Sequence, residues 1–355
     1  MNTSLSLKLG RGSRSASPVY NNAALTDWRT ALTNRATAPA RIMVIGHSVV
    51  ERYNAMTRGL RWVDLLALNL RTAYPTSGAT GNAEGSSYRK AKYFSGDAPT
   101  AWNAVIGGGG TGFGSNLGAG GVDLVTVAEG YRYDFTGTSF EVFVLDWAES
   151  RIMSIVVDGG APVLFETNGQ TKYTSGALSE AAHTVALTKS SGGHPTLGGL
   201  MFYNGDETKG IQVIDAGRPA ALAGQFMDSY INGQFTWSTI DLMILQTVEN
   251  DYNIQTALAT FKTDVAGQIA AARAYTGATT FPVLLLAGAE PTNLGSLAIP
   301  YASYIAKMKE VADEGTKVAV LDLSGAGIAL DTDNLHPNVA GHATLGARVA
   351  SALGL

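Results

Sequence analysis

The feature of this sequence that most constrains its fold is a change of period along the chain. Two stretches alternate short apolar β-rich runs with longer patterns of helical spacing, whereas the stretch between them contains β-rich runs only. The β-rich runs of the alternating stretches cover residues 41–45, 211–214, 242–245, 283–286 and 318–321, and helical patterns cover residues 60–74, 255–275, 301–313 and the chain from about 339. Because strands that are apolar on both faces are typical of a parallel sheet covered by helices, the pattern predicts an α/β fold with a doubly wound sheet of five parallel strands. A ligand crevice is expected at the carboxyl ends of those strands.

The middle stretch, residues 76–209, has a different texture. A Gly/Ser-rich lead is followed by short strand-like runs separated by turn signals such as Asp158-Gly159-Gly160. The runs cover residues 122–127, 132–135, 140–145, 152–157, 163–165, 184–188 and 200–203. This pattern predicts an all-β sandwich inserted into a surface loop of the α/β domain. The predicted organisation is an N-terminal arm at residues 1–40 with Trp28 as its anchor, a discontinuous α/β domain at residues 41–75 and 210–355, and the inserted domain at residues 76–209.

Composition narrows the class of protein. A hydrophobic fraction of 45% and a charged fraction of 15% are those of a folded globular chain. The net charge of −4 gives no basic footprint for a phosphate backbone, so a nucleic-acid partner is not expected. The absence of cysteine excludes disulfides, thiolate nucleophiles and cysteine-ligated zinc. Residues 1–11 lack the apolar core of a Sec signal peptide, and no apolar run is long enough to span a bilayer, so we expect neither feature.

Ser48 is the first candidate for chemistry. It follows the run 41–45 through Gly46 and His47, where the first strand turns toward its helix. A serine at this place exposes its hydroxyl above the sheet, and its own N–H, near a helix start, faces a developing oxyanion. The same position also suits a serine that only caps the following helix, so the motif by itself leaves a structural alternative.

A second candidate lies between the last strand and the last helix, where Asp333 stands three residues before His336. A histidine can act as general base for a serine hydroxyl, and a carboxylate can fix its tautomer and stabilise the imidazolium. Such a pair is often only a loop-capping pair. Its place at the same crevice edge as Ser48 favours the catalytic interpretation.

Four short motifs, taken in order, resemble the sequence blocks of the SGNH (GDSL-type) hydrolases. They are Ile45-Gly46-His47-Ser48, Asp215-Ala216-Gly217, the segment 246–251 with Asn250, and Asp333-x-x-His336-Pro337. His47 stands where the family has aspartate, and Val248 stands where it has glycine. The resemblance implies a flavodoxin-like three-layer α/β/α sandwich with five parallel strands.

The resemblance also implies a serine esterase with an acyl-enzyme intermediate. Ser48 would be the nucleophile, with His336 and Asp333 completing the triad. The N–H groups of Ser48 and Gly217 and the side-chain amide of Asn250 would form the oxyanion hole, and no metal or other cofactor is implied. His47 is the alternative to His336 as general base. Adjacent residues at a strand end usually point apart, so we expect His47 to support the catalytic residues and not to act as the base.

The inserted domain resembles the jelly-roll or carbohydrate-binding-like domains of SGNH esterases that remove acetyl groups from polysaccharides and peptidoglycan. An acetylated polysaccharide or cell-wall glycan is therefore the expected substrate. Tyr131, Tyr133, Phe140 and Trp147 are candidates to stack on sugars, although strand alternation favours the core for half of them. The glycine-rich segment 107–112 is interpreted as a loop, and only loops of the insert are expected to reach the active site.

Three functional hypotheses stay open at this point: a carbohydrate O-acetylesterase, a lipase or thioesterase on the same scaffold, and a non-catalytic glycan-binding protein of a virion or cell surface. The architecture also resembles esterases of bacteriophage tails. Virion or cell-surface proteins are therefore candidate partners, and an extracellular or virion-associated location is suspected.

Overall fold

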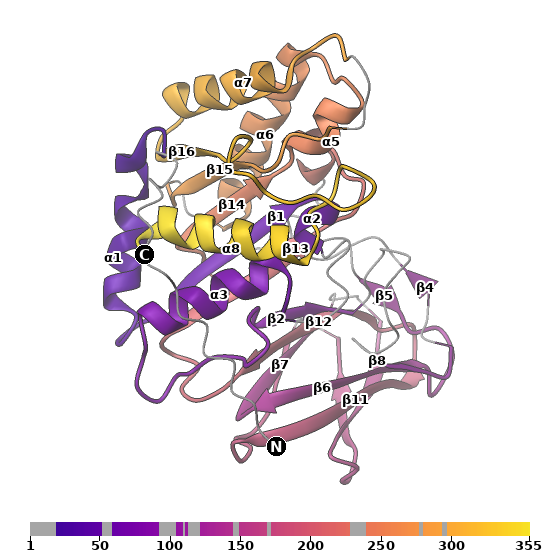
Figure 1. The fold of residues 1–355 in the computed structure, drawn as a ribbon. Coiled ribbons are helices and arrows are strands. Elements are labelled where there is room, and N and C mark those ends of the chain that lie inside the picture. The colour runs from indigo at the N-terminus through magenta and orange to yellow at the C-terminus, as the bar shows by residue number, and fades with distance from the viewer. Residues whose placement is uncertain are drawn as a thin grey trace.

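The computed structural model describes residues 19–51, 59–91, 104–108, 111–112, 121–144, 149–168, 172–227, 239–276, 280–292 and 297–355. Figure 1 shows helices gathered around a central sheet in one part of the molecule and antiparallel strands in the other.

The central sheet is parallel throughout. Its strands are β1 (Ala40–Gly46), β13 (Ile211–Gly217), β14 (Leu242–Gln246), β15 (Val283–Ala287) and β16 (Val318–Asp322), in the order β13-β1-β14-β15-β16. Nearly every residue of these strands is buried, as their apolar runs predicted. The flavodoxin-like strand order is therefore confirmed. It places the expected ligand crevice beside the carboxyl end of β1, where the strand order reverses.

Helices cover both faces of this sheet, since alternate residues of each strand point to opposite sides. One core contains Ile42 and Val44 of β1 with apolar residues of α1 (Thr26–Asn34), α3 (Trp62–Ala73) and α8 (Val339–Leu353). The other contains Met43 and Ile45 with residues of α5 (Val248–Asn253), α6 (Leu258–Thr276) and α7 (Tyr301–Glu314). Shorter elements are η1 (Asn22–Leu25), α2 (Ser48–Glu51) and η3 (Ala223–Met227).

The described part of the N-terminal arm packs on the α/β domain through α1. The Trp28 side chain is fully buried, and its Nε1 donates to the Leu353 carbonyl at 3.2 Å. The expectation that Trp28 anchors the arm is thus confirmed, while residues 1–18 lie outside the described part of the chain.

The strands between β1 and β13 form two antiparallel sheets. One has the order β10-β7-β12-β5-β4 with β2 paired to β12, and the other has the order β3-β6-β11-β8-β9. The strands are β2 (Tyr88–Lys90), β3 (Ala104–Ile106), β4 (Thr111–Gly112), β5 (Val122–Asp123), β6 (Gly130–Gly137), β7 (Ser139–Val144), β8 (Arg151–Val157), β9 (Val163–Glu166), β10 (Lys172–Thr174), β11 (Ala181–Gly192) and β12 (Thr196–Tyr203). The predicted run 122–127 is a strand only over its first two residues, and β4 lies within the segment that was interpreted as a loop.

A separate apolar core lies between these two sheets. Tyr131, Tyr133 and Phe140 belong to it and are almost fully buried. These rings therefore pack the sandwich and are not platforms for sugars, whereas Trp147 lies outside the described residues. The domain boundaries at residues 75/76 and 209/210 stay a prediction.

The sheet that contains β7 and β12 also packs against the parallel sheet. Tyr88, Phe143 and Met201, from β2, β7 and β12, share one core with Met43 and Ile214 of the parallel sheet. The insert thus covers part of a face that helices cover elsewhere. The sandwich therefore has its own core and, in addition, an apolar outer face that packs against the parallel sheet.

Candidate active site

Three sequence-predicted residues meet at the carboxyl edge of the parallel sheet. Ser48 begins α2 directly after β1, and Asp333 and His336 lie in the loop between β16 and α8. Ser48 Oγ lies 2.7 Å from His336 Nε2, and His336 Nδ1 lies 2.7 Å from Asp333 Oδ2. Ser48 is 6% exposed and His336 is 8% exposed. The three side chains form one continuous hydrogen-bonded chain with the order and geometry of a Ser-His-Asp triad.

The loop that carries the histidine is held by its own carboxylate. Asp333 Oδ1 accepts the backbone N–H groups of Leu335 and His336, both at 3.0 Å. The next element begins at once, because the Asn338 side chain caps α8 by accepting the N–H of Gly341 at 3.0 Å. The imidazole is therefore fixed from both sides, with Nδ1 toward the carboxylate and Nε2 toward Ser48.

The electrostatic surroundings suit a general base. Burial lowers the pKa of His336, and the hydrogen bond and charge of Asp333 offset only part of that effect, so the pKa is below its ordinary value. Burial would raise the pKa of Asp333, but the N–H groups of His336 and Leu335 and the His336 ring outweigh it, and this pKa is lowered. At neutral pH the imidazole is accordingly neutral and the carboxylate is charged.

The turn that presents Ser48 depends on Gly46. A Cβ at this position would lie 2.4 Å from the Gln246 carbonyl oxygen and 2.5 Å from Val50 Cγ2, far inside contact distance. The turn is closed by the N–H groups of Val50 and Glu51, which donate to the His47 carbonyl at 3.0 and 3.1 Å. Glycine is thus required where β1 passes close to β14 and turns into α2.

His47 contacts a different partner from Ser48. Its Nε2 lies 2.7 Å from Glu249 Oε2, and both side chains are about 1% exposed. Glu249 also accepts from Gln246 Nε2 and from the Gly288 N–H, each at 2.9 Å. Burial would raise the pKa of Glu249, but His47 and Gln246 lower it below the ordinary value. This buried pair joins the ends of β1, β14 and β15, which agrees with the supporting role expected of His47.

Gly217 differs from the expectation. Its N–H, predicted to face the oxyanion, donates to Asp215 Oδ1 at 2.9 Å, so it is occupied in this structure. The glycine is needed for another reason, because a Cβ there would lie 2.6 Å from the Glu51 nitrogen. Gly217 therefore lets the end of β13 approach α2, and its role as an oxyanion donor stays a prediction.

Asn250 lies on α5, directly after β14, and is half-buried. Its Nδ2 donates to the Ala221 carbonyl at 3.0 Å. A side-chain amide has two hydrogens, so one remains for a ligand. Its role as an oxyanion donor stays a prediction.

A cluster of buried charges behind Ser48 was not predicted from the sequence. Lys90 Nζ lies 2.7 Å from Glu51 Oε1, and Arg61 forms a two-pronged ion pair with Asp64 and a further ion pair with Asp215. All five side chains are at most 2% exposed. The tertiary fold brings these side chains together, so their pairing leaves no pattern in the sequence. The one sequence feature that could have drawn attention to Lys90 is the short polar run Tyr88-Arg89-Lys90 inside the insert.

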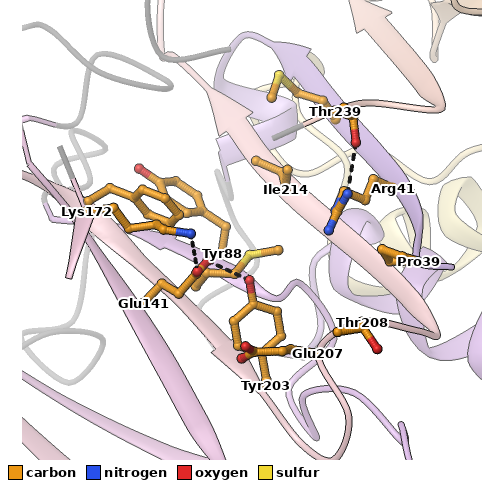
Figure 2. A pocket seen from close by; sticks show the side chains of 13 residues that line it. Pro39, Arg41, Tyr88, Glu141, Lys172, Tyr203, Glu207, Thr208, Ile214 and Thr239 are labelled. Atoms are coloured by element: carbon orange, nitrogen blue, oxygen red, sulfur yellow. Dashed lines mark hydrogen bonds and ion pairs between the residues drawn. The ribbon is translucent and has the colours of Figure 1, made fainter. Parts of the chain in front are cut away.

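A cavity of about 450 Å³ lies between the edge of the parallel sheet and the insert, apart from the triad (Figure 2). Its lining residues are Pro39, Arg41, Met43, Tyr88, Glu141, Phe143, Lys172, Met201, Tyr203, Glu207, Thr208, Ile214 and Thr239. Figure 2 shows Glu141 between Lys172 and Tyr203, whose hydroxyl donates to it at 2.7 Å, and Arg41 beside Thr239. The cavity combines apolar walls with charged groups of both signs.

The described residues show neither a cluster of metal ligands nor a membrane-spanning helix. No three histidine or acidic side chains gather there as a metal would require. Within the same residues, no helix combines the length and apolarity needed to cross a bilayer.

No protein-family model and no curated protein matches this chain. Among solved structures, that of a peptidoglycan O-acetylesterase is similar, with 16% sequence identity, a TM-score of 0.69, and coverage of 95% of this chain and 97% of the other. A carbohydrate esterase family 2 enzyme from Corynascus thermopiles (Myceliophthora fergusii) and a family two carbohydrate esterase from Clostridium thermocellum share 14% and 13% identity. They cover 71% and 65% of this chain and 98% and 93% of their own, with TM-scores of 0.35 and 0.33, too low to carry an argument. This likeness shows the fold, so the expected three-layer α/β/α sandwich of five parallel strands with an inserted β domain is confirmed for this chain.

Proposed function

We propose that this chain is a serine esterase that removes O-acetyl groups from a carbohydrate polymer. The observation that carries the proposal is the hydrogen-bonded chain from Asp333 through His336 to Ser48 at the carboxyl edge of the parallel sheet. A hydroxyl alone is a weak nucleophile, and a neutral imidazole at 2.7 Å is the group that activates it.

The proposed mechanism has two halves. Ser48 Oγ attacks the ester carbonyl carbon while His336 Nε2 takes the hydroxyl proton, and Asp333 stabilises the imidazolium. The tetrahedral intermediate expels the sugar hydroxyl, which receives the proton from His336, and leaves an acyl-enzyme on Ser48. Water, deprotonated by the same imidazole, then attacks the acyl carbon. The second tetrahedral intermediate breaks its bond to Ser48 Oγ, which takes the proton back from His336, and acetate is released. The oxyanion is held by the Ser48 N–H and the free hydrogen of the Asn250 amide.

The proposed substrate class is supported by the similarity to a solved structure. The structural neighbour with the TM-score of 0.69 is a peptidoglycan O-acetylesterase, and the likeness extends over almost the whole chain, including the insert. We therefore propose an acetylated polysaccharide or cell-wall glycan as the substrate. Virion or cell-surface proteins as further partners, and an extracellular or virion-associated location, remain proposals of the same kind.

The cavity of Figure 2 is the place where we propose that the polymer contacts the insert. Apolar walls with a few convergent polar groups are typical of small-ligand sites, and the volume of about 450 Å³ lies in their usual range. Met43 and Ile214 offer apolar surface, while Arg41, Lys172 and Glu207 offer charged groups to sugar hydroxyls.

The proposal is tested by acetate release from a panel of acetylated glycans, with short- and long-chain nitrophenyl esters alongside. The wild type should release acetate, prefer the short acyl chain, and be labelled by a fluorophosphonate at Ser48. Ser48→Ala should fold normally and lose nearly all turnover. Preference for long acyl chains would favour the lipase or thioesterase alternative, and no hydrolysis of any ester would favour a glycan-binding protein.

A further inference from the structure

We infer that Lys90, a residue of the inserted β region, is a positioning residue for the proposed nucleophile. It ties the end of β13 to the short helical turn that begins with Ser48. The inference rests on the proposed function, since it concerns how Ser48 is held in register with His336.

The contacts of Lys90 converge on this turn. Its side chain is fully buried, and Nζ donates to Glu51 Oε1 at 2.7 Å and to the Gly217 carbonyl at 2.5 Å. Glu51 is the last residue of α2, three positions after Ser48, and Gly217 is the last residue of β13. One ammonium group therefore bonds both the helical turn and the strand against which it packs.

The described part of α2 is held to its surroundings through Glu51. Glu51 is held at two points, since its carbonyl accepts from Arg61 Nη1 at 3.0 Å and its carboxylate accepts from Lys90. A buried ammonium group destabilises the fold unless it is paired. The burial of Lys90 therefore depends on these contacts.

The insert fixes the position of Lys90 in turn. Lys90 lies in β2 opposite Gly199 of β12, and the residues just before β2 are tied to β13, where the Ser87 N–H donates to the Val213 carbonyl at 2.8 Å. The expectation that only loops of the insert reach the active site stays a prediction, because Lys90 contacts Glu51 and Gly217, which are not members of the triad. A strand of the insert supplies a group that bonds the proposed catalytic turn.

Arg71 provides a matched control for a test of this inference. It is half-buried and bonds the Ile211 carbonyl, at the opposite end of β13, with Nε at 3.0 Å and Nη2 at 2.8 Å. It also bonds the chain before β2 through the Asn82 and Gly85 carbonyls. Lys90→Met and Arg71→Met thus each remove one cation that joins β13 to the segment around β2, but only Lys90 acts at the end beside Ser48.

Both variants should unfold at lower temperature than the wild type. Below the melting temperature, Lys90→Met should lower kcat for nitrophenyl acetate and the rate of fluorophosphonate labelling at Ser48 by about tenfold or more, with KM nearly unchanged, because a small displacement of a reacting group is costly. Arg71→Met should stay within about twofold of the wild type in both measurements. Equal losses in the two variants, or a wild-type labelling rate in Lys90→Met, would overturn the inference.

A crystal structure of Lys90→Met separates this inference from the proposed function. It should show the Gly217 carbonyl and the α2 turn displaced, with the contact between Ser48 and His336 lengthened. An unmoved turn would overturn the positioning role even if the wild type proved inactive. A wild type that neither hydrolyses esters nor reacts with the probe would instead refute the proposed function, and the structure of the variant would still decide the role of Lys90.

Discussion

The carboxylate of Asp333 holds both the backbone and the ring of His336, and this has a consequence for the pH dependence of the reaction. The neutral imidazole is the active form, so activity is lost as pH falls through the pKa of His336. Burial, only partly offset by Asp333, places that pKa below 6.5. The acid limb of kcat/KM against pH should therefore have its midpoint below 6.5.

The Asp333→Asn variant tests the cause of this limb. The carboxylate raises the pKa of His336 against the effect of burial, so its loss should move the limb to still lower pH. The same variant should lower kcat steeply, because an amide can hold the wrong tautomer of the ring. A limb at or above 6.5 in the wild type, or one that moves upward in the variant, would contradict this assignment of the base.

Asn250 supports a second prediction at this scale. If its free amide hydrogen meets the oxyanion, Asn250→Ala should lower kcat for nitrophenyl acetate by roughly a hundredfold or more with little change in KM, since the charge exists only in the transition state. Asn253→Ala, another half-buried asparagine of the same helix, is the control and should leave kcat unchanged. A change confined to KM would make Asn250 a substrate-binding residue.

The sequence predicted the residues that follow strand ends, because the carboxyl ends of parallel strands meet at one edge. Ser48 and His336 are 288 residues apart, yet the order of the elements brings them together. The sequence did not predict the roles of Glu249 and Lys90, because a buried ion pair leaves no periodic signal. The contact between the Gly217 N–H and the Asp215 side chain was not predictable either, because spacing along the chain does not reveal the orientation of a side chain.

At the scale of the elements, the pair of His47 and Glu249 joins three strand ends. His47→Ala would leave the Glu249 carboxylate buried without its histidine partner, which should cost about 3 kcal/mol of unfolding free energy. Turnover by the folded variant should be reduced far less than in His336→Ala, because His47 contacts Glu249 and not the nucleophile's hydroxyl. Denaturant unfolding and kcat, measured on both variants, check this. A loss of kcat as large as that of His336→Ala would make His47 the base.

The cavity between the insert and the parallel sheet also allows a prediction. Lys172→Ala removes an exposed cation from its rim and should raise KM for the acetylated polymer about tenfold, the lower end of the value of one hydrogen bond to a charged group. Nitrophenyl acetate is too small to reach from Ser48 to this cavity, so its hydrolysis should not change. Lys209→Ala, which removes a surface ion pair with Asp206 outside the cavity, should change neither. An unchanged KM for the polymer in Lys172→Ala would exclude this cavity as its contact.

Element by element, the long buried strands were predictable and the short ones were not. The five parallel strands are apolar on both faces and stand out in the sequence. In the run 122–127 the apolar residues looked like a strand, yet β5 covers only Val122–Asp123, and Val125 and Val127 are 37% and 61% exposed. β2 has three polar or aromatic residues and is a strand only because β12 lies beside it.

At the scale of the whole molecule, the sequence predicted two kinds of structure but not how they join. Along β7 and β12, alternate residues face the sandwich core, and the others look like an ordinary outer face. Those others include Phe143 and Met201, which are buried against Met43 and Ile214 of the parallel sheet. Period-2 alternation identifies two faces of a strand, but it does not tell which face meets solvent and which meets another domain.

This joint core changes what removal of the insert should do. If the insert were an independent module, a Gly/Ser linker in place of residues 76–209 would leave hydrolysis of nitrophenyl acetate intact. The structure leads us to expect the opposite, because the truncation uncovers Met43, Ile45 and Ile214, each contributing roughly 1.5–3 kcal/mol when buried, and removes Lys90 from the Ser48 turn. Circular dichroism, thermal melting and fluorophosphonate labelling should show a truncated chain that is unfolded, or folded and unreactive, while the full-length Lys172→Ala protein stays folded and labelled. A folded truncation that is labelled at the wild-type rate would mean that the insert contributes nothing to the catalytic edge.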